Sequence, residues 1–281
     1  MIEEEAPKQQ SRNILRDKGK QLSRRFDLTD AANAALFLAA FIGIWQLVTL
    51  SGIYPKTLLP APAQVAGTIM DLVANYSLVT GFAMTMARLL AGFTISVILG
   101  GSIGLVMMRF PGFGRTMSSF GVGLLTFPSI AWVPFAILLM GFNDFAILFV
   151  VVMASVFSIM ISTYSAMRNI PPLYIRSAKN MGATGFALFR HVMIPAATPS
   201  LIIALRQGWS FAWHALIGAE MLIATLYGLG HVLAVGRDFN DMGQIIATMI
   251  TIFAIGIVFD RLIFLKIEEK VRSRWGLTQH A

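Results

Sequence analysis

Long apolar segments alternate with short polar ones along most of this chain. Two stretches, residues 31–55 and 116–143, contain no charged residue and are 25 and 28 residues long. Roughly 20 apolar residues are enough to cross a bilayer as an α-helix. The pattern predicts six transmembrane helices, at residues 31–50, 84–108, 117–139, 145–167, 200–224 and 243–264. The chain is therefore expected to be an all-α integral membrane protein.

The composition agrees with this class. Hydrophobic residues make up 56% of the chain and charged residues 13%, whereas a soluble domain has about a quarter of its residues charged. The chain has no cysteine, which excludes disulfides and thiolate metal sites. We expect no metal site and no catalytic residue in this protein.

Basic residues are distributed unevenly between the two sides of the predicted bundle. Eighteen of the 22 Lys and Arg residues lie on the side of the two termini, and only Lys56 and Arg237 lie on the other. Such an excess marks cytosolic segments, so both termini are predicted to be cytosolic. This bias accounts for the net charge of +8 without a nucleic-acid partner. The predicted parts are a cytosolic tail (1–30), a transmembrane domain (31–264) and a second cytosolic tail (265–281).

The predicted cytosolic segment at residues 168–198 contains a polar helical element. Pro171 and Pro172 stand where prolines favour the start of a helix. Residues 174–181 have a helical pattern, and Gly182 suits the left-handed position that ends a helix. A polar element of this size between two spans indicates contact with a cytosolic partner.

A second short helix is expected directly after this glycine. Thr184 can cap it, and it should run to about Met193 and end at Pro195. Ala178 and Gly182 are small residues, which would leave a low surface that fits a partner's groove.

At these residues the chain resembles the membrane subunits of bacterial ABC importers, whose cytosolic loop carries an E-x-A motif, a glycine and an I/L-P ending. The matching residues are Ser177 with Ala178, then Gly182, then Ile194 with Pro195. The similarity to the nitrate/sulfonate/taurine branch covers residues 45–275. It includes the segments LLPAPAQV, ARLLAGFTISVILGGSIGLVM, FPSIAWVPFAILLMGFND, AWHALIGAEML and GLG, and the closing segment 260–275.

The resemblance implies the type I ABC importer permease arrangement in the inner (plasma) membrane, with a coupling helix between the fourth and fifth spans. It also implies a second copy of the chain, two cytosolic ATPase subunits and an external or periplasmic substrate-binding protein. ATP and Mg²⁺ would be held by the ATPases, and the chain indeed has no GxxxxGK[ST] phosphate loop. The implied substrate is a small organic or inorganic anion, such as a sulfonate, taurine or nitrate.

The resemblance also places seven residues at the contact with the ATPase. In this chain Arg176 occupies the motif position that is usually Glu, so the chemistry of the contact is expected to differ. The residues are Tyr174, Arg176, Ser177, Ala178, Lys179, Gly182 and Ala183.

Small residues and prolines mark two of the predicted spans. Gly100 and Gly104 have the GxxxG spacing that lets helix backbones approach closely, either within the bundle or at a dimer seam. Pro128 and Pro134 interrupt the third span, as a structural kink or as part of the lining of a path. Pro128 and the adjacent Ser129 are candidates for the transport path.

Three ionisable residues fall within the predicted spans. Arg88 is expected to reach the outer interface by snorkelling, and Arg206 to serve as a structural anchor. Glu220 could belong to a pathway, a salt bridge or a helix end. Because the fifth span helps to line the path in the resembling family, Trp213, His214 and Glu220 are further path candidates.

Two other classes of protein would have different sequence features. A channel or secondary transporter that works without ATPases would predict paired charges within the membrane or internal repeats, and would leave the polar cytosolic element unexplained. A membrane-embedded enzyme would need a catalytic motif, and the chain has no HExxH or GxSxG sequence.

Overall fold

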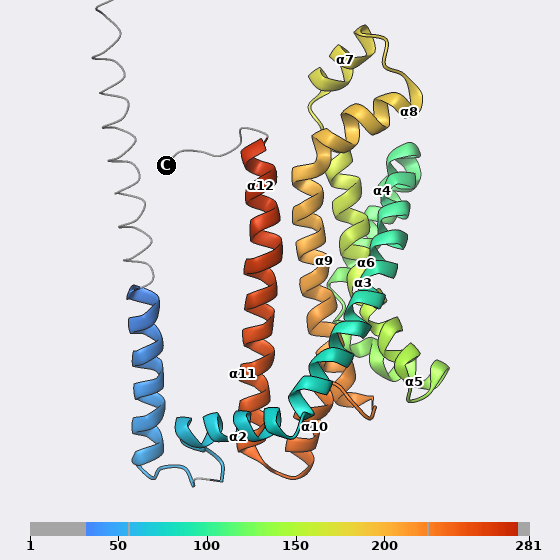
Figure 1. Ribbon diagram of the computed structural model, residues 1–281. Helices are drawn as coiled ribbons and strands as arrows, with labels where there is room; N and C mark the ends of the chain where they lie inside the picture. Colours follow the sequence, from blue (N-terminus) through green and yellow to red (C-terminus); the bar gives the residue numbers. More distant parts are fainter. Residues whose placement is uncertain (1–31, 56, 224, 275–281) are drawn as a thin grey trace, which may run out of the picture. The chain divides into compact units, whose positions relative to one another are not determined.

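The computed structural model describes residues 32–55, 57–223 and 225–274, and every regular element among them is helical (Figure 1). The tail predicted at residues 1–30 and the last residues of the C-terminal tail lie outside the described residues. The chain forms two units, Met1–Val65 and Ala66–Ala281. In the first unit a helix covers Ala32–Leu50, and the indole N–H of Trp45 donates to the carbonyl of Pro60 at 3.1 Å. This bond ties the end of the helix to the proline-rich segment after it.

The rest of the described chain is a succession of helices, three of which are not α-helical. The 3-10 helix is η1, and η2 and η3 are π-helical. In chain order the elements are α2 (Pro62–Ala74), α3 (Ser77–Arg109), α4 (Pro111–Leu125), η1 (Ser129–Ala131), α5 (Trp132–Met140), α6 (Asp144–Arg168), α7 (Pro172–Asn180), α8 (Gly185–Leu188), η2 (Phe189–Met193), α9 (Ile194–Leu222), α10 (Leu229–Asp238), α11 (Met242–Phe259), η3 (Asp260–Leu265) and α12 (Lys266–Arg274).

Five of the described helical segments are long and apolar enough to cross a membrane, and a bent pair brings the number to six. The bent pair, Pro111–Leu125 with Ser129–Met140, turns by 89°. The prediction of six spans is thus confirmed, and so is the predicted interruption of the third span (residues 117–139) at Pro128. Pro128 has ψ 121° just before η1, a conformation that a helix cannot contain. The other segments are Ala32–Leu50, Ser77–Arg109, Asp144–Arg168, Gly185–Leu222 and Met242–Val271.

The packing centres on α6. More than half of its apolar window, 56%, is buried, a larger share than in the other four spans that are not bent. Both α3 and α9 pack along it (Figure 1). The helix begins where the Asn143 side chain accepts a hydrogen bond from the amide of Ala146 at 3.1 Å, as an N-cap does.

Three glycines of α3 face α6 at very short range. A Cβ on Gly92 would lie 2.7 Å from Cγ1 of Val151, and one on Gly100 would lie 2.6 Å from the carbonyl oxygen of Val156. At Gly104 the corresponding distance to the Met160 carbonyl oxygen is 2.7 Å. These glycines are buried inside the subunit, so the interpretation as packing within the bundle is confirmed and the dimer seam is wrong.

Two helices continue where the sequence predicted that they end. Pro195 does not stop the helix after residue 185, because α8, η2 and α9 form one helical segment, Gly185–Leu222. Proline has no backbone N–H to donate to the preceding turn. The π-helical turn η2 shifts the hydrogen-bond register just before Pro195, so the helix continues without that bond. In the same way α11 passes through η3 into α12, so the described part of the C-terminal tail begins as a helix.

Candidate functional site

The corner after α7 closes by two backbone hydrogen bonds. Gly182 has φ +86°, in the left-handed region. Its N–H donates to the carbonyl of Lys179, and the N–H of Ala183 donates to the carbonyl of Ala178, both at 2.9 Å. This pair of bonds is the Schellman ending of a helix. The predicted helix start, helix and glycine corner are all confirmed.

The second short helix begins where it was predicted to begin. Thr184 has an extended backbone, with φ −134°, and α8 starts at the next residue. The side chain of Thr184 makes no capping hydrogen bond, so the predicted side-chain cap is wrong.

The predicted coupling residues differ in how far they are exposed to solvent. Tyr174, Arg176, Ser177, Lys179 and Gly182 are exposed, and Ala183 is half-buried. Ala178 is only 3% exposed, because it lies under the corner that its carbonyl helps to close. The expectation that Ala178 forms part of an open surface is therefore wrong.

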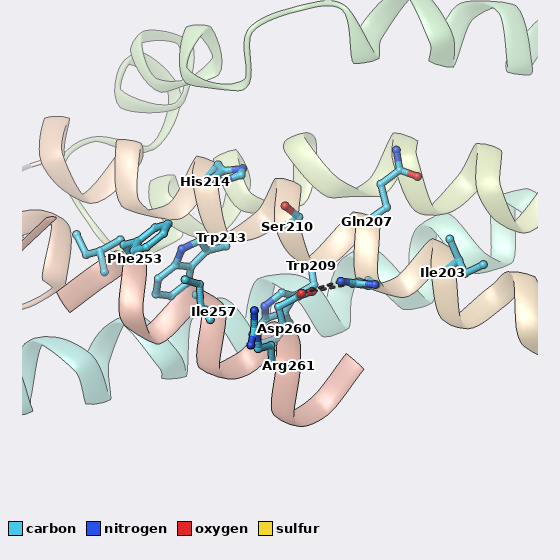
Figure 2. A pocket seen from close by; sticks show the side chains of 13 residues that line it. Ile203, Gln207, Trp209, Ser210, Trp213, His214, Phe253, Ile257, Asp260 and Arg261 are labelled. Atoms are coloured by element: carbon cyan, nitrogen blue, oxygen red, sulfur yellow. Dashed lines mark hydrogen bonds and ion pairs between the residues drawn. The ribbon is translucent and has the colours of Figure 1, made fainter. Parts of the chain in front are cut away.

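A stripe of polar side chains runs along one side of α9. Gln207, Ser210 and His214 are exposed and lie three and four residues apart, which places them on one face of the helix. Figure 2 shows the three side chains on the same side of α9. Polar side chains at membrane depth usually face a bundle interior or a water-filled cavity. In the single subunit this face of α9 is uncovered.

A cavity of about 680 Å³ lies beside this stripe, between α9 and the last span (Figure 2). Trp213 and His214, two of the predicted path residues, both line it. Phe253 and Ile257 of α11 add apolar wall, and Arg261 of η3 adds a basic group. The cavity has the size of a small-molecule site.

A second cavity, of about 210 Å³, lies at the break in the third span. Pro128 and Ser129 line it, together with Phe211 of α9. Irregular backbone at membrane depth is tolerated where it is buried in protein or lines a cavity. The helix α9 thus contributes to two cavities, and four of the five predicted path residues line one or the other.

Glu220, the fifth predicted path residue, lines neither cavity. Its carboxylate is buried and accepts hydrogen bonds from the Thr85 hydroxyl at 2.8 Å and from the amide of Gly230 at 3.0 Å. Arg88 Nη1 lies 2.8 Å from Glu220 Oε1. Of the roles left open by the sequence, the structure shows the salt bridge.

Arg88 does not snorkel to the interface. Its side chain is 6% exposed, and besides Glu220 it pairs with Asp144 at 2.8 Å and donates to the carbonyl of Tyr227 at 2.6 Å. One guanidinium thus joins α3, α6, α9 and the segment before α10. The snorkelling prediction is wrong. It rested on the position of Arg88 near the end of the span, whereas the partners of Arg88 hold its side chain inside the bundle.

The partners of this buried cluster were missed by reasoning from sequence. Thr85, one turn before Arg88, also accepts the N–H of Leu229 at 2.9 Å. A Cβ on Gly228 would lie 2.6 Å from the carboxyl carbon of Glu220. Glu220 lies in the motif AWHALIGAEML, and Gly228 begins the motif GLG. The sequence shows both motifs, but it does not show that they contact each other in the fold.

Arg206 is an anchor, as expected, between α9 and the last span. It pairs with Asp260 of η3 at 2.6 Å and with Glu268 of α12 at 3.2 Å. Both its Nε and its Nη2 donate to the Asp260 carboxylate. This two-point geometry is the strong form of an Arg–carboxylate contact. Among the described residues there is no group of three or more His, Cys, Asp or Glu that could hold a metal ion.

The family model for binding-protein-dependent transport system inner membrane components matches residues 92–265. The chain belongs to this family. The matched region includes the corner after α7, the α9 stripe and Glu220. The protein is therefore an ABC importer permease subunit, and the hydrolysis of ATP is not a reaction of its family.

Relatives that match over most of both chains support this assignment. A protein named as an ABC transporter permease in Brucella melitensis is 30% identical to this permease, over 84% of this chain and 94% of its own. An aliphatic sulfonates transport permease of Escherichia coli is 29% identical, over 85% and 90%. A bicarbonate transport system permease of Synechococcus elongatus is 29% identical, over 80% and 84%.

Solved structures show the same fold. The permease matches a chain of an amino acid ABC transporter with a TM-score of 0.60 at 18% identity, covering 72% of this chain and 98% of that one. It matches a chain of the MetNI methionine ABC transporter in an inward-facing conformation with a TM-score of 0.57 at 22% identity, covering 70% and 96%. The type I importer permease arrangement expected from the resemblance is confirmed.

The stand-alone carrier is excluded by family membership and not by the charges. That alternative predicted paired charges within the membrane, and the structure does contain them, in Arg88 with Glu220. Buried ion pairs are also common structural features. Paired charges therefore do not distinguish a carrier from a permease.

Proposed function

We propose that two copies of this permease line one path for a small anion, and that two cytosolic ATPases drive the transport. An external or periplasmic binding protein would deliver the substrate, and the ATPases would hold ATP and Mg²⁺. The observation that carries the proposal is the polar stripe of Gln207, Ser210 and His214, which is exposed in the middle of a span.

The stripe requires a polar neighbour. Side chains of this kind are costly in contact with lipid and are normally directed toward protein or water. A second copy related by two-fold symmetry would present the same stripe. The two stripes would then enclose a polar path, of which the cavity beside Trp213 and His214 is one half.

An anionic substrate is favoured by the charges around that cavity. Arg206 and Asp260 line it as a pair that also includes Glu268, and Arg261 adds a basic group to the lining. The two relatives named for a substrate are named for aliphatic sulfonates and for bicarbonate, both of which are anions. The inner (plasma) membrane, with both termini cytosolic, is the location that the 18 basic residues on one side support.

Coupling to the ATPases would pass through the helical segment Gly185–Leu222. It begins at the corner after α7, carries the polar stripe and ends at Leu222, two residues beyond Glu220. At about 1.5 Å per residue, such a segment links points far apart in the molecule. Figure 1 shows α8 at an angle to α9. Force applied to α7 and α8 would thus reach the residues that line the path.

Chemical labelling can test the path directly, because the chain has no native cysteine. We expect a Ser210→Cys permease, assembled with its ATPases, to react with a membrane-impermeant thiol reagent, since water should reach the stripe. Binding of substrate or a change of nucleotide state should alter the rate. The measurement is the time course of labelling in proteoliposomes.

Two further single-cysteine variants serve as controls for this labelling. Ala212→Cys lies at a fully buried position of the same helix, and Ile98→Cys at an exposed apolar position of α3. Both should stay unlabelled over the same time. Labelling of Ile98→Cys as fast as Ser210→Cys, or no labelling of Ser210→Cys, would exclude a water-filled path along the stripe.

The coupling role of the corner can be tested at Gly182. No atom lies within 4 Å of a Cβ placed there, so Gly182→Trp adds bulk to the surface and strain to the left-handed backbone. We expect at least about a tenfold loss of affinity for the ATPase, which corresponds to about 1.4 kcal/mol. Co-purification and substrate-stimulated ATP hydrolysis measure it.

The matched control at the same position is Gly182→Asn. Asn tolerates the left-handed conformation and is much smaller than Trp, so assembly should persist. If Gly182→Trp assembled and transported as well as Gly182→Asn, the proposed coupling role of this corner would be wrong.

A further inference from the structure

The segment that joins α6 to α9 carries charge of one sign only. Between Asp144 and Glu220 the chain contains no Asp or Glu. Arg176, Lys179 and Arg190 lie exposed in this segment, and none of them forms an ion pair with another described residue. The exposed surface of α7 and α8 is therefore uniformly basic.

The positive-inside bias does not account for this uniformity. That bias concerns Lys and Arg, whereas Asp and Glu have little influence on orientation. The other long segments on the same predicted side do contain acids. Residues 1–30 hold seven bases and six acids, and α12 carries Glu268 and Glu269 next to its lysines. The absence of acids is a property of the α7–α8 segment itself.

The same surface exposes large apolar side chains. Leu173 is 68% exposed, Met181 80% and Phe186 72%, with Tyr174 beside them. Figure 1 shows α7 beyond the ends of α6 and α9, at the tip of the second unit. An apolar centre with a polar, charged rim is the composition of a protein–protein interface. We call this surface the basic knob, and its members are Leu173, Tyr174, Arg176, Lys179, Met181 and Phe186.

We infer that the basic knob docks into an ATPase groove that has an apolar floor and Asp or Glu carboxylates on its walls. This inference rests on the proposed function and adds the chemistry of the partner. Opposite charges across an interface fix the register and speed association. Arg176 occupies the motif position that is usually Glu, so a groove that suits an acid there would repel this chain. Selectivity for its own ATPase would follow from that repulsion.

The test measures binding of the full-length permease, in nanodiscs of zwitterionic lipid, to the ABC ATPase subunit of its own importer. The variant is Arg176→Glu with Lys179→Glu, and the neutral variant is Arg176→Gln with Lys179→Gln. Lys270→Glu in α12 is the control, because Lys270 is an exposed base outside the knob. We expect the reversed variant to bind at least about tenfold more weakly and the neutral variant to fall between it and the native chain. Lys270→Glu should bind like the native chain.

Salt supplies a second measurement on the unmodified protein. The Debye length falls from about 10 Å at 0.1 M salt to about 3 Å at 1 M, so native binding should weaken over this range and the reversed variant should respond in the opposite direction. If charge reversal or salt left binding unchanged while Gly182→Trp abolished it, docking would stand and the acidic groove would be wrong. If Gly182→Trp also bound normally, the proposed function itself would fail. If charge reversal instead changed only the response to nanodiscs containing phosphatidylglycerol, the knob would bind lipid and the inference would be overturned.

Discussion

Replacing Arg88 with methionine is expected to destabilise the permease by about 3–5 kcal/mol, the loss measured when a buried ion pair loses one partner. The Glu220 side chain is 0% exposed, so loss of the guanidinium leaves a buried carboxylate without its charged partner. The Thr85 hydroxyl and the Gly230 amide would remain as its donors. The carbonyl of Tyr227 would lose the N–H that Arg88 donates to it. Methionine keeps much of the length of the arginine stem, so the change removes the charge and its hydrogen bonds and keeps most of the apolar packing.

This loss can be measured as the free energy of unfolding of the purified permease in detergent. The Arg237–Asp238 pair provides a control, because its side chains are 53% and 63% exposed. Exposed pairs contribute about 1 kcal/mol or less, so Arg237→Met should change stability little. Equal effects of Arg88→Met and Arg237→Met would contradict the buried cluster.

A double variant separates the lost attraction from the unpaired charge. Glu220→Gln removes the negative charge and keeps an oxygen for the Thr85 and Gly230 donors. In Arg88→Met with Glu220→Gln no carboxylate is left buried without a partner, so the double variant should be more stable than Arg88→Met alone. Contacting residues are expected to show such non-additive effects. A double variant destabilised by the sum of the single changes would mean that the two side chains act independently.

The apolar pattern predicted the membrane class and the number of spans, because a span of helix needs a fixed length of apolar sequence. It did not predict the 89° bend in the third span. Pro128 and Pro134 were both visible as interruptions, yet they have different effects. Pro134 lies in the first turn of α5, where a proline removes no helical hydrogen bond. Pro128 has an extended ψ and separates the two helices. The local sequence does not indicate which of the two prolines will break the helix.

The candidate site was predicted where its chemistry is local and missed where it depends on distant partners. The corner at Gly182 follows from residues within one turn, and it was predicted correctly. The Arg88–Glu220 pair joins residues 132 positions apart, so the sequence analysis treated each charge separately. It therefore placed Glu220 on the path, although α3 and α10 cover its carboxylate. A single sequence does not show which helices are neighbours.

Alanine at Gly104 should destabilise the permease through the contact between α3 and α6. A Cβ there would lie 2.7 Å from the carbonyl oxygen of Met160 and 2.8 Å from Cβ of Thr163. The carbonyl belongs to a helix backbone and cannot turn away as a flexible side chain can, so the two helices must separate. Overpacking of this kind costs about 1–3 kcal/mol. The unfolding free energy of the purified subunit measures the effect, and Gly100→Ala should behave similarly, for the same reason at Val156.

Gly101→Ala is the matched control for this change. It lies in the same helix, but nothing lies within 4 Å of its Cβ position, and alanine is a better helix former than glycine by up to about 1 kcal/mol. Its stability should equal or exceed that of the native chain. If Gly104→Ala unfolded like Gly101→Ala but no longer formed the dimer proposed above, the GxxxG spacing would mark a seam between subunits, and the close approach of α3 to α6 would be wrong. Loss of subunit stability with dimerisation intact among the folded molecules is the outcome that the buried position of Gly104 requires.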